Sequence, residues 1–332
     1  MQRVVIAGTG SAVPERVVTN HELEKLVDTS DEWIVQRTGI RERRFVGPSE
    51  ANSDLSVPAA RRALEMAGIP ATDLDGIILC SVTPDTFVPA GSCYVHRDLG
   101  AVNATAFDLT AACTGWIYGV HVGRTMIQAG QWRHCVVIGA ECLSRILNMT
   151  DRNTCVLFGD GAGAVVLSRG DLAPHVPEGS AIVDSCTGTD GTGWDLIVQP
   201  AGGARMPASV ETVTNHLHAL TMRGREVFKF AVKKMAEMVR VCLERNGLTL
   251  DDIALIVPHQ VNIRILEAVF DALHLPMDRC MVNLDRYGNT SAASVPIALD
   301  EAVRAGRIRR GDLVFATAFG SGLTWGWALI RF

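Results

Sequence analysis

The sequence predicts an α/β fold that consists of two duplicated halves. Three observations lead to this prediction. Strand-like and helix-like segments alternate along the chain, the second half repeats the order of the first, and short stretches of sequence recur in both halves. Such alternation is typical of sheets of buried, partly parallel strands whose faces are covered by helices.

The first half contains four apolar segments that we expect to form strands and two segments that we expect to form helices. The strands are predicted at VVIAGTG (4–10), DGIILCSVT (75–83), HCVVIGAE (134–141) and AGAVVLS (162–168). The first helix is predicted over 53–69, where Ser or Asp caps its start and Gly68 lies near its end. The second is predicted over 110–130, a stretch rich in small residues.

The second half repeats this alternation. Helices are predicted over 225–248, 263–275 and 291–306, and strands over 252–260, 279–285 and 311–322. The helix over 225–248 has one apolar stripe, which indicates a buried face. The stripe consists of Phe228, Val232, Met235, Val239 and Cys242.

Local sequence also recurs between the halves. Ala129-Gly130 and Ala305-Gly306, 176 positions apart, each close a helix, and FGDGAG (158–163) corresponds to FGSGLT (319–324). At the same offset, Cys113 falls opposite Asn289. We therefore expect a duplicated unit with a pseudo-twofold axis, with residues 1–170 as the N-terminal half and 171–332 as the C-terminal half. Chance similarity between two α/β halves is the alternative.

Residues 187–222 interrupt the pattern. The segment carries five glycines and little periodicity, so it predicts loops with short strands. A long loop in a compact domain is often a lid or a pocket wall, and the alternative is a simple surface insertion.

Composition excludes several classes of protein. With 332 residues, 48% AVILMFWYC and 20% charged residues, the chain is too apolar to be disordered and long enough for a large core. A formal net charge of −5 gives no reason to propose a nucleic-acid partner. We find no signal-peptide pattern and no run near the ~20 apolar residues of a membrane span. The nine cysteines are scattered without a C-x-x-C pair, which argues against disulfides and structural zinc and favours a reducing cytoplasm.

Three residues are candidates for chemistry. Cys113 lies where an apolar strand turns into a helix, and a helix N-terminus stabilises a thiolate. His259 follows a buried strand and is a candidate base or hydrogen-bond donor. Asn289 alone reads as a turn or cap residue. Inert core, turn and cap roles are the alternatives for each residue alone, but Cys, His and Asn together are a known arrangement for thiol catalysis.

Seven segments carry a family resemblance. They are TSDEWIVQRTGIRERR (29–44), DLTAACTGWIYG (108–119), TDRNTCVLFGDGAGA (150–164), GREVFKFAV (224–232), VPHQVNIR (257–264), NLDRYGNTSAAS (283–294) and FGSGLTWG (319–326). With these segments in order, the chain resembles the β-ketoacyl-acyl-carrier-protein synthase III family of the thiolase superfamily, essentially from end to end. The resemblance implies a thiolase-like fold, with the duplicated halves in five αβαβα layers.

The resemblance also implies an activity: the initiating condensation of type II fatty acid biosynthesis, in a cytoplasmic homodimer. Cys113 would take the acyl group of a short acyl-CoA as a thioester. His259 and Asn289 would hydrogen-bond the thioester carbonyl of malonyl-acyl carrier protein while CO2 leaves. The enolate would then attack the acyl-Cys113 thioester and give 3-ketoacyl-acyl carrier protein. Decarboxylation drives this reaction, so no metal or redox cofactor is implied.

Binding residues follow from the same resemblance. The backbone N–H groups of Cys113 and Ser321 would form the oxyanion hole, although family members often carry Gly or Ala at the latter position. Trp33, Arg37, Arg152 and Asn262 would bind CoA, and Lys229 and Arg264 would dock the acidic carrier protein. Asp271-Ala272 stands where family members can carry a Lys pair, which puts the strength of docking or the identity of the carrier in doubt.

The acyl pocket is expected to be lined by Phe158 and Phe319 and closed by Phe87 of the partner subunit. We interpret Leu143 as ordinary core packing.

Three other functions remain as alternatives. The nearest is a synthase III-like starter enzyme of a polyketide or quinolone pathway, with a different acyl donor or acceptor; plant-type polyketide synthases share Cys–His–Asn but are longer. The second is a non-catalytic subunit of a ketosynthase heterodimer, against which retention of all three residues argues. The third is a Rossmann oxidoreductase, but GTGSAV (8–13) lacks the third glycine of the dinucleotide fingerprint.

Overall fold

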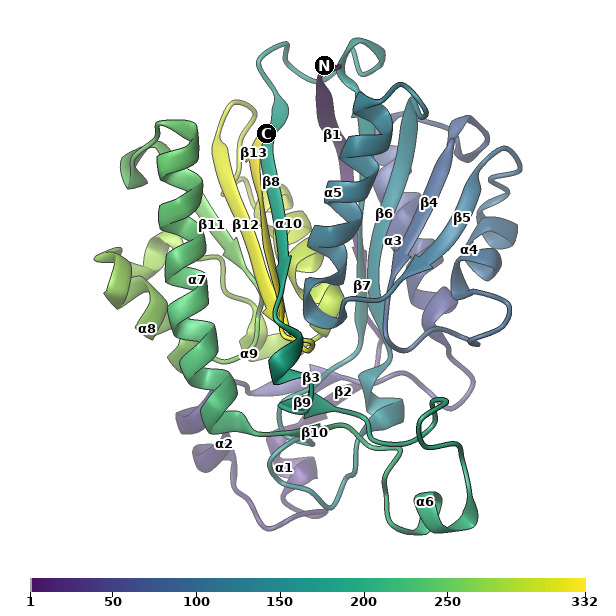
Figure 1. The fold of residues 1–332 in the computed structure, drawn as a ribbon, viewed down its shortest axis with the longest axis vertical. Coiled ribbons are helices and arrows are strands. Elements are labelled where there is room, and N and C mark those ends of the chain that lie inside the picture. The colour runs from purple at the N-terminus through teal and green to yellow at the C-terminus, as the bar shows by residue number, and fades with distance from the viewer. Residues whose placement is uncertain (1) are drawn as a thin grey trace.

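The computed structural model describes residues 2–332, which form two large mixed sheets and two small two-stranded sheets, β9-β10 and β2-β3 (Figure 1). The five-stranded sheet has the order β1-β7-β6-β4-β5, and the four-stranded sheet has the order β11-β12-β13-β8. The strands of the first are β1 (Val4–Ala12), β4 (Gly76–Cys80), β5 (Thr105–Leu109), β6 (His134–Glu141) and β7 (Gly161–Arg169). Those of the second are β8 (Ala181–Thr189), β11 (Leu255–Pro258), β12 (Leu313–Gly320) and β13 (Thr324–Arg331).

Helices cover both faces of each sheet and produce five layers, as expected (Figure 1). Helices α5 (Gly115–Gln128) and α10 (Ser294–Arg304) lie between the sheets. Helices α3 (Asn52–Ala67) and α4 (Gly91–Leu99) cover the outer face of the five-stranded sheet. Helices α7 (Gly224–Asn246) and α8 (Ile263–Leu273) cover the outer face of the four-stranded sheet. The predicted αβαβα architecture is therefore confirmed.

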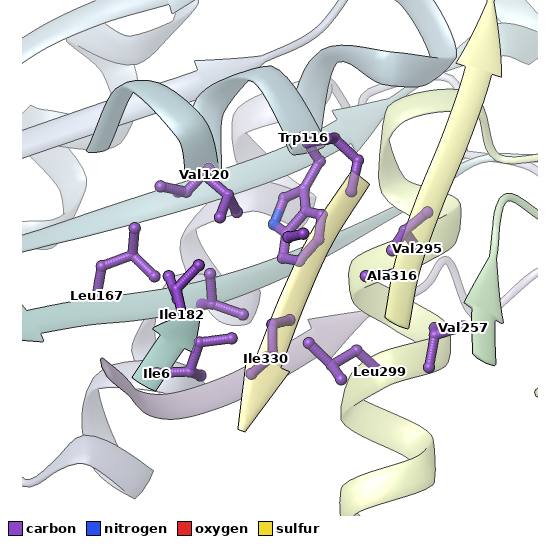
Figure 2. Packing of buried hydrophobic residues seen from close by; sticks show 14 of the residues in the cluster. Ile6, Trp116, Val120, Leu167, Ile182, Val257, Val295, Leu299, Ala316 and Ile330 are labelled. Atoms are coloured by element: carbon purple, nitrogen blue, oxygen red, sulfur yellow. The ribbon is translucent and has the colours of Figure 1, made fainter. Parts of the chain in front are cut away.

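The central layer is apolar and closely packed (Figure 2). Trp116 and Val120 of α5 meet Leu167 from one sheet and Ile330 from the other. The small residues of α5 permit this close approach: a Cβ at Gly119 would lie 2.5 Å from the sulfur of Cys80. The stretch rich in small residues is thus the helix that is covered on both sides by sheets.

Sheet topology confirms the duplication. In the five-stranded sheet, β1 pairs with β7 and β7 with β6 in antiparallel fashion, and β6 pairs with β4 in parallel. The four-stranded sheet has the same order of directions: β8 with β13 and β13 with β12 are antiparallel, and β12 with β11 is parallel. The expected boundary at residue 170 falls between β7 and β8. The division into two domains stays a prediction.

The expectation that duplication places Cys113 opposite Asn289 is wrong. Helix α5 has 14 residues and α10 has 11, so an offset that aligns their C-terminal ends cannot align their N-terminal ends. Each helix is preceded by a 3-10 turn whose first residue has a positive φ: Ala112 (φ 47°) and Ser291 (φ 50°), 179 positions apart. By this alignment, Cys113 corresponds to Ala292.

The strand predicted over 279–285 is also absent. Only Cys280 forms a bridge, to Ile256 of β11, and a short helix α9 (Leu284–Tyr287) follows. The side-chain amide of Gln260 takes the place of a neighbouring strand, because its Nε2 donates to the carbonyl of Met281 and its Oε1 accepts from the N–H of Asn283. The carbonyl of Met281 and the N–H of Asn283 therefore have hydrogen-bond partners without pairing to a neighbouring β-strand.

Residues 187–222 form loops with short elements, as predicted. They contain β9 (Ile197–Val198), α6 (Val210–Thr214) and β10 (Thr221–Met222), and β9 pairs with β10. The remaining elements are β2 (Val17–Thr19), α1 (Asn20–Leu23), α2 (Asp31–Thr38) and β3 (Glu42–Arg44). All of them lie at the end of the sheets opposite to the chain termini (Figure 1). Within residues 2–332, no helix has both the length and the apolar character needed to cross a membrane.

Candidate active site

Cys113, His259 and Asn289 line one cavity of about 210 Å³. Two of them come from the C-terminal half and one from the N-terminal half. The cavity wall is largely apolar, and the loop over 187–222 supplies part of it through Trp194, Ile197 and Met222. The interpretation of that loop as a pocket wall is therefore confirmed. A larger open groove of about 1000 Å³, over Arg62 and Asp300, contains none of the three candidate residues.

Cys113 lies in the 3-10 turn (Ala112–Thr114) between β5 and α5. The end of β12 passes directly beside it: a Cβ at Gly320 would lie 2.9 Å from the backbone nitrogen of Cys113. Glycine is required at position 320 because a side chain there would collide with the backbone that carries the thiol.

The electrostatic surroundings of Cys113 differ from the sequence expectation. Burial raises the pKa of the thiol to about 11, and the carboxylate of Glu141 acts in the same direction, whereas a hydrogen bond with Ser291 lowers the pKa. Burial of the thiol therefore opposes the stabilisation of a thiolate that the sequence predicts.

His259 is buried at the end of β11. Burial lowers its pKa to about 3, so the ring is neutral near pH 7. Its Nδ1 lies 2.5 Å from Oγ of Ser294, the first residue of α10. That hydroxyl accepts from the backbone N–H of Gln260 at 3.4 Å, and Nδ1 is its only hydrogen-bond acceptor among residues 2–332, so its own proton is directed to Nδ1. Nε2 then carries the ring proton and is a hydrogen-bond donor.

Hydrogen bonds to backbone groups fix both the main chain and the side chain of Asn289. Its N–H donates to the carbonyl of Leu157 (2.8 Å), and its carbonyl accepts from the N–H of Gly159 (3.0 Å). Its side-chain Oδ1 accepts from the N–H of Ser291 at 2.8 Å. Because this bond fixes which end of the amide faces the protein, Nδ2 is left as a donor on the other side.

Ser321 lines the cavity beside Gly320, in the turn between β12 and β13. Its hydroxyl donates to the carbonyl of Ile197 in β9 at 2.6 Å. The serine side chain therefore ties this turn to the cavity wall, while the expected role of its backbone N–H in an oxyanion hole stays a prediction.

Three of the residues expected to bind CoA lie close together: Trp33 and Arg37 of α2, and Arg152. The guanidinium carbons of Arg37 and Arg152 lie 5.4 Å and 5.0 Å from the ring centroid of Trp33. Arg152 also donates to the carbonyl of Asp28 at 2.9 Å. An aromatic face flanked by two cations is suited to a stacked, negatively charged nucleotide.

Asn262 has two structural bonds. It caps α8 by accepting from the N–H of Arg264 (2.9 Å), and its Nδ2 donates to the carbonyl of Arg37 (3.0 Å). It thereby joins α8 to α2, and its contact with the pantetheine arm stays a prediction. Arg264 and Lys229 are exposed on α8 and α7, which pack against each other.

Phe158 and Phe319 line the cavity as expected, and the ring of Phe319 meets His259 edge-on at 5.8 Å. Leu143 lines it as well, so its interpretation as ordinary core packing is wrong. Phe87 is 82% exposed and lines no part of the cavity of its own chain.

Sequence reasoning missed Ser291, Ser294 and Glu141. The two serines stand in TSAAS at the start of a helix, where serine is ordinarily a cap. Glu141 ends a strand and has no spacing that connects it to Cys113. No group of His, Cys, Asp and Glu side chains within residues 2–332 is arranged to hold a metal ion.

Comparisons with known proteins agree with this architecture. The family model described as 3-Oxoacyl-[acyl-carrier-protein (ACP)] synthase III matches residues 107–191, and the model for its C-terminal part matches residues 243–332. A curated β-ketoacyl-[acyl-carrier-protein] synthase III of Caldanaerobacter subterraneus subsp. tengcongensis is 54% identical over 326 residues, which cover 98% of this chain and 97% of the relative. That of Symbiobacterium thermophilum is 52% identical over 328 residues, with 99% and 98% covered.

Solved structures give the same result. The crystal structure of 3-oxoacyl-[acyl-carrier-protein] synthase III from Aquifex aeolicus matches with a TM-score of 0.90 and 42% identity, over 99% of this chain and all of that chain (100%). The five-layered fold, with a cysteine in its central cavity, defines a thiolase-fold acyltransferase. The chain belongs to the β-ketoacyl-acyl-carrier-protein synthase III family.

Proposed function

We propose that this chain catalyses the initiating condensation of fatty acid biosynthesis, between a short acyl-CoA and malonyl-acyl carrier protein. The observation that carries the proposal is the convergence of Cys113, His259 and Asn289 on one largely apolar cavity. The curated relatives carry the name β-ketoacyl-[acyl-carrier-protein] synthase III, so the alternative of a specialised starter enzyme is not favoured.

The first half-reaction transfers the acyl group. The thiol of Cys113 gives up its proton to solvent as its sulfur attacks the thioester carbon of acyl-CoA. CoA leaves as a thiolate that takes up one proton from solvent, so the half-reaction is proton-neutral. Negative charge develops on the thioester oxygen, where the N–H groups of Cys113 and Ser321 donate. Loss of one such donor costs roughly 3 kcal/mol of transition-state stabilisation.

The second half-reaction is a decarboxylation followed by carbon–carbon bond formation. The malonyl carboxylate leaves as CO2, and its electron pair moves toward the thioester carbonyl to form an enolate. His259 Nε2–H and Asn289 Nδ2–H donate to that oxygen, and a neutral histidine suits this role because it need not lose a proton. The enolate carbon attacks the acyl-Cys113 thioester, the carbon–sulfur bond breaks, and Cys113 leaves as a thiolate that takes up one proton from solvent. The balance closes without a redox or metal cofactor, because decarboxylation supplies the driving force.

We also infer a homodimer, in the cytoplasm, that accepts an acidic carrier protein at Lys229 and Arg264. Phe87 and Val88 are 82% and 89% exposed, and β5 is an edge strand with one neighbour. Exposed apolar side chains and an open sheet edge each favour a partner subunit. Phe87 would then close the acyl pocket of the partner.

The direct test is product formation. Purified protein is incubated with acetyl-CoA or a branched acyl-CoA together with malonyl-acyl carrier protein, and the carrier is weighed by mass spectrometry. The proposal predicts 3-ketoacyl-acyl carrier protein and one CO2 per product. Transfer of the acyl group to the carrier without loss of CO2 would contradict it.

A further inference from the structure

Two buried threonines, Thr114 and Thr324, join the turn that carries the nucleophile to the turn that carries Ser321. Their hydroxyl oxygens lie 2.9 Å apart, although the two residues are 210 positions apart in the chain and belong to different halves. Thr114 is the last residue of the 3-10 turn that contains Cys113, and Thr324 is the first residue of β13. Their exposed fractions are 0% and 7%, and neither residue lines the cavity. The pair therefore lies behind the reacting groups.

The hydrogen-bond partners of the two hydroxyls decide which one donates. The hydroxyl of Thr324 has two backbone acceptors, the carbonyl of Ser321 at 2.9 Å and the carbonyl of Ala111 at 3.3 Å. Within residues 2–332, the hydroxyl of Thr114 has no acceptor other than the oxygen of Thr324. Because each hydroxyl carries one proton, Thr114 donates to Thr324, and Thr324 donates to the backbone. The direction of donation therefore runs from the turn of the nucleophile to the turn of Ser321.

On the side of the nucleophile, the two threonines hold the backbone before and after Cys113. The carbonyl of Ala111 accepts from the backbone N–H of Thr114 at 3.1 Å, and the hydroxyl of Thr324 lies 3.3 Å from the same oxygen. These contacts involve the residue two positions before Cys113 and the residue directly after it. They fix the 3-10 turn that contains the backbone N–H of Cys113.

On the other side, the turn of Ser321 has two further attachments, both to the loop that forms part of the cavity wall. The hydroxyl of Ser321 donates to the carbonyl of Ile197 at 2.6 Å. Leu323 exchanges two backbone hydrogen bonds with Asp190, at 2.7 Å and 2.8 Å. These bonds attach the turn to the loop, whereas the hydroxyl of Thr324 attaches it to the turn of the nucleophile.

We propose that the hydroxyls of Thr114 and Thr324 set the spacing between the backbone N–H groups of Cys113 and Ser321, and thereby the stabilisation of the oxyanion that forms in acylation. The proposal rests on the proposed function and adds two positioning residues to it. A buried hydroxyl is favourable only when it is hydrogen-bonded, and an apolar side chain of the same shape would fill the space without this requirement. Oxyanion stabilisation requires donors at about 2.7–3.1 Å from the developing charge. Two hydroxyls that fix both turns therefore act on the rate without contacting the substrate.

The first test is the rate at which acetyl-CoA acylates Cys113 in a single turnover, followed by intact-protein mass spectrometry without malonyl-acyl carrier protein. Thr324→Val keeps the shape of the side chain and removes its hydroxyl. We expect the limiting rate of acylation to fall by on the order of 100-fold, because the donors no longer meet the oxyanion. The acetyl-CoA concentration that gives half the limiting rate should change little, because Thr324 has no contact with the residues expected to bind CoA. Thr324→Ser, which restores the hydroxyl, should recover most of the rate.

Thr114→Val tests whether the two hydroxyls act as a unit. The change leaves the hydroxyl of Thr324 in place and removes the group that donates to it, so we expect a smaller loss of the limiting rate, on the order of 10-fold. Because Thr114 acts through Thr324, the double variant should be no slower than Thr324→Val alone.

A spectroscopic measurement separates a change in the oxyanion hole from a general loss of structure. A hydrogen bond to a carbonyl oxygen weakens the C=O bond and lowers its stretching frequency. Acetyl-CoA that is isotope-labelled at its carbonyl carbon therefore reports, in infrared difference spectra, the hydrogen bonds that the carbonyl of acyl-Cys113 receives. We expect the labelled band to move to higher wavenumber in Thr324→Val and to return in Thr324→Ser.

Thr317→Val is the matched control. Thr317 lies in β12 of the same hairpin, is 1% exposed, and donates its hydroxyl proton to the carbonyl of Gly326 at 3.1 Å. Valine at this position removes one buried hydroxyl and its bond to a backbone carbonyl, but leaves the contact between Thr114 and Thr324 intact. The control should lower the melting temperature and leave the limiting rate of acylation and the infrared band unchanged.

Three results would overturn the inference: an unchanged acylation rate in Thr324→Val, a slower rate with an unchanged infrared band, or losses that multiply in the double variant. If Thr324→Val does not fold, an unchanged rate and band in Thr114→Val overturn the inference in its place. If the unsubstituted protein forms no adduct with acetyl-CoA or isobutyryl-CoA, the proposed function itself fails, and this outcome is visible before any variant is measured.

Discussion

The hydroxyl of Ser294 lies 2.5 Å from Nδ1 of His259, and this contact decides which ring nitrogen faces the substrate. The serine is the first residue of α10, and the histidine follows β11. Because burial keeps the ring neutral, only one nitrogen carries a proton. A helix at the centre of the fold therefore fixes the nitrogen that, under the proposed function, donates to the enolate.

Ser294→Ala removes this control. We expect decarboxylation of malonyl-acyl carrier protein to slow by on the order of 100-fold, because part of the population then presents an unprotonated Nε2. Acylation of Cys113 should change little. The two rates are measured separately, as CO2 release and as protein mass, and Ser294→Thr, which keeps a hydroxyl, should restore most of the decarboxylation. Equal losses in both half-reactions would refute this assignment.

Asn289→Asp tests the second donor with a side chain of the same shape. The carboxylate still accepts from the N–H of Ser291, but it has no proton to donate to the enolate. Decarboxylation should fall by at least on the order of 100-fold, while Cys113 still takes up an acyl group. The comparison requires CO2 release with malonyl-acyl carrier protein and the mass of the acylated protein. Retained decarboxylation would show that Nδ2 is not a donor.

Gly320→Ala tests the close approach of β12 to the nucleophile. The added Cβ would lie 2.9 Å from the backbone nitrogen of Cys113, so the turn that carries the thiol has to move. We expect a loss of roughly 1–3 kcal/mol of unfolding free energy and a strong loss of acylation. Gly179→Ala is the matched control, because an added Cβ there meets no atom within 4 Å. Normal acylation by Gly320→Ala would contradict the geometry described above.

Stability should depend on pH through His259. Its pKa is about 3 in the folded protein and near 6.5 in the unfolded chain, so between these values only the unfolded state binds the proton. The contribution of the neutral ring is complete above pH 6.5 and is lost as pH falls toward 3. Relative to His259→Gln, the native protein should lose about 1.4 kcal/mol per pH unit in this window. Chemical denaturation of both proteins at pH 7, 6, 5 and 4 measures the difference, and parallel pH dependence would contradict a buried neutral ring.

The alternation of segments was sufficient to predict the duplicated α/β fold, the family resemblance implied its five layers, and both led to three side chains that line one cavity. Apolar segments of strand length and recurring motifs predicted the duplicated fold, and Cys113, His259 and Asn289 each stand at the end of a recognisable segment. The strand over 279–285 was predicted wrongly, because nothing in its own sequence reveals that the side chain of Gln260 satisfies its backbone.

The supporting residues of the site could not be predicted for a similar reason. Ser294 acts on a residue 35 positions away, and Ser291 reaches Glu141 across 150 positions. Such contacts depend on how sheets and helices pack, and serine at a helix start has an ordinary local explanation. The sequence also does not reveal that α5 and α10 differ in length, and the prediction that Cys113 corresponds to Asn289 was wrong for this reason.

Under the proposed function, Cys113 carries the acyl group. The most direct measurement is the intact mass of the protein after incubation with a panel of acyl-CoAs, for the native chain and for Cys113→Ala. If Cys113 carries the acyl group, one acyl mass is added to the native chain and none to the variant, and the adduct is lost when malonyl-acyl carrier protein is supplied. An adduct of equal amount on Cys113→Ala, or none on the native chain with any acyl-CoA, would contradict it.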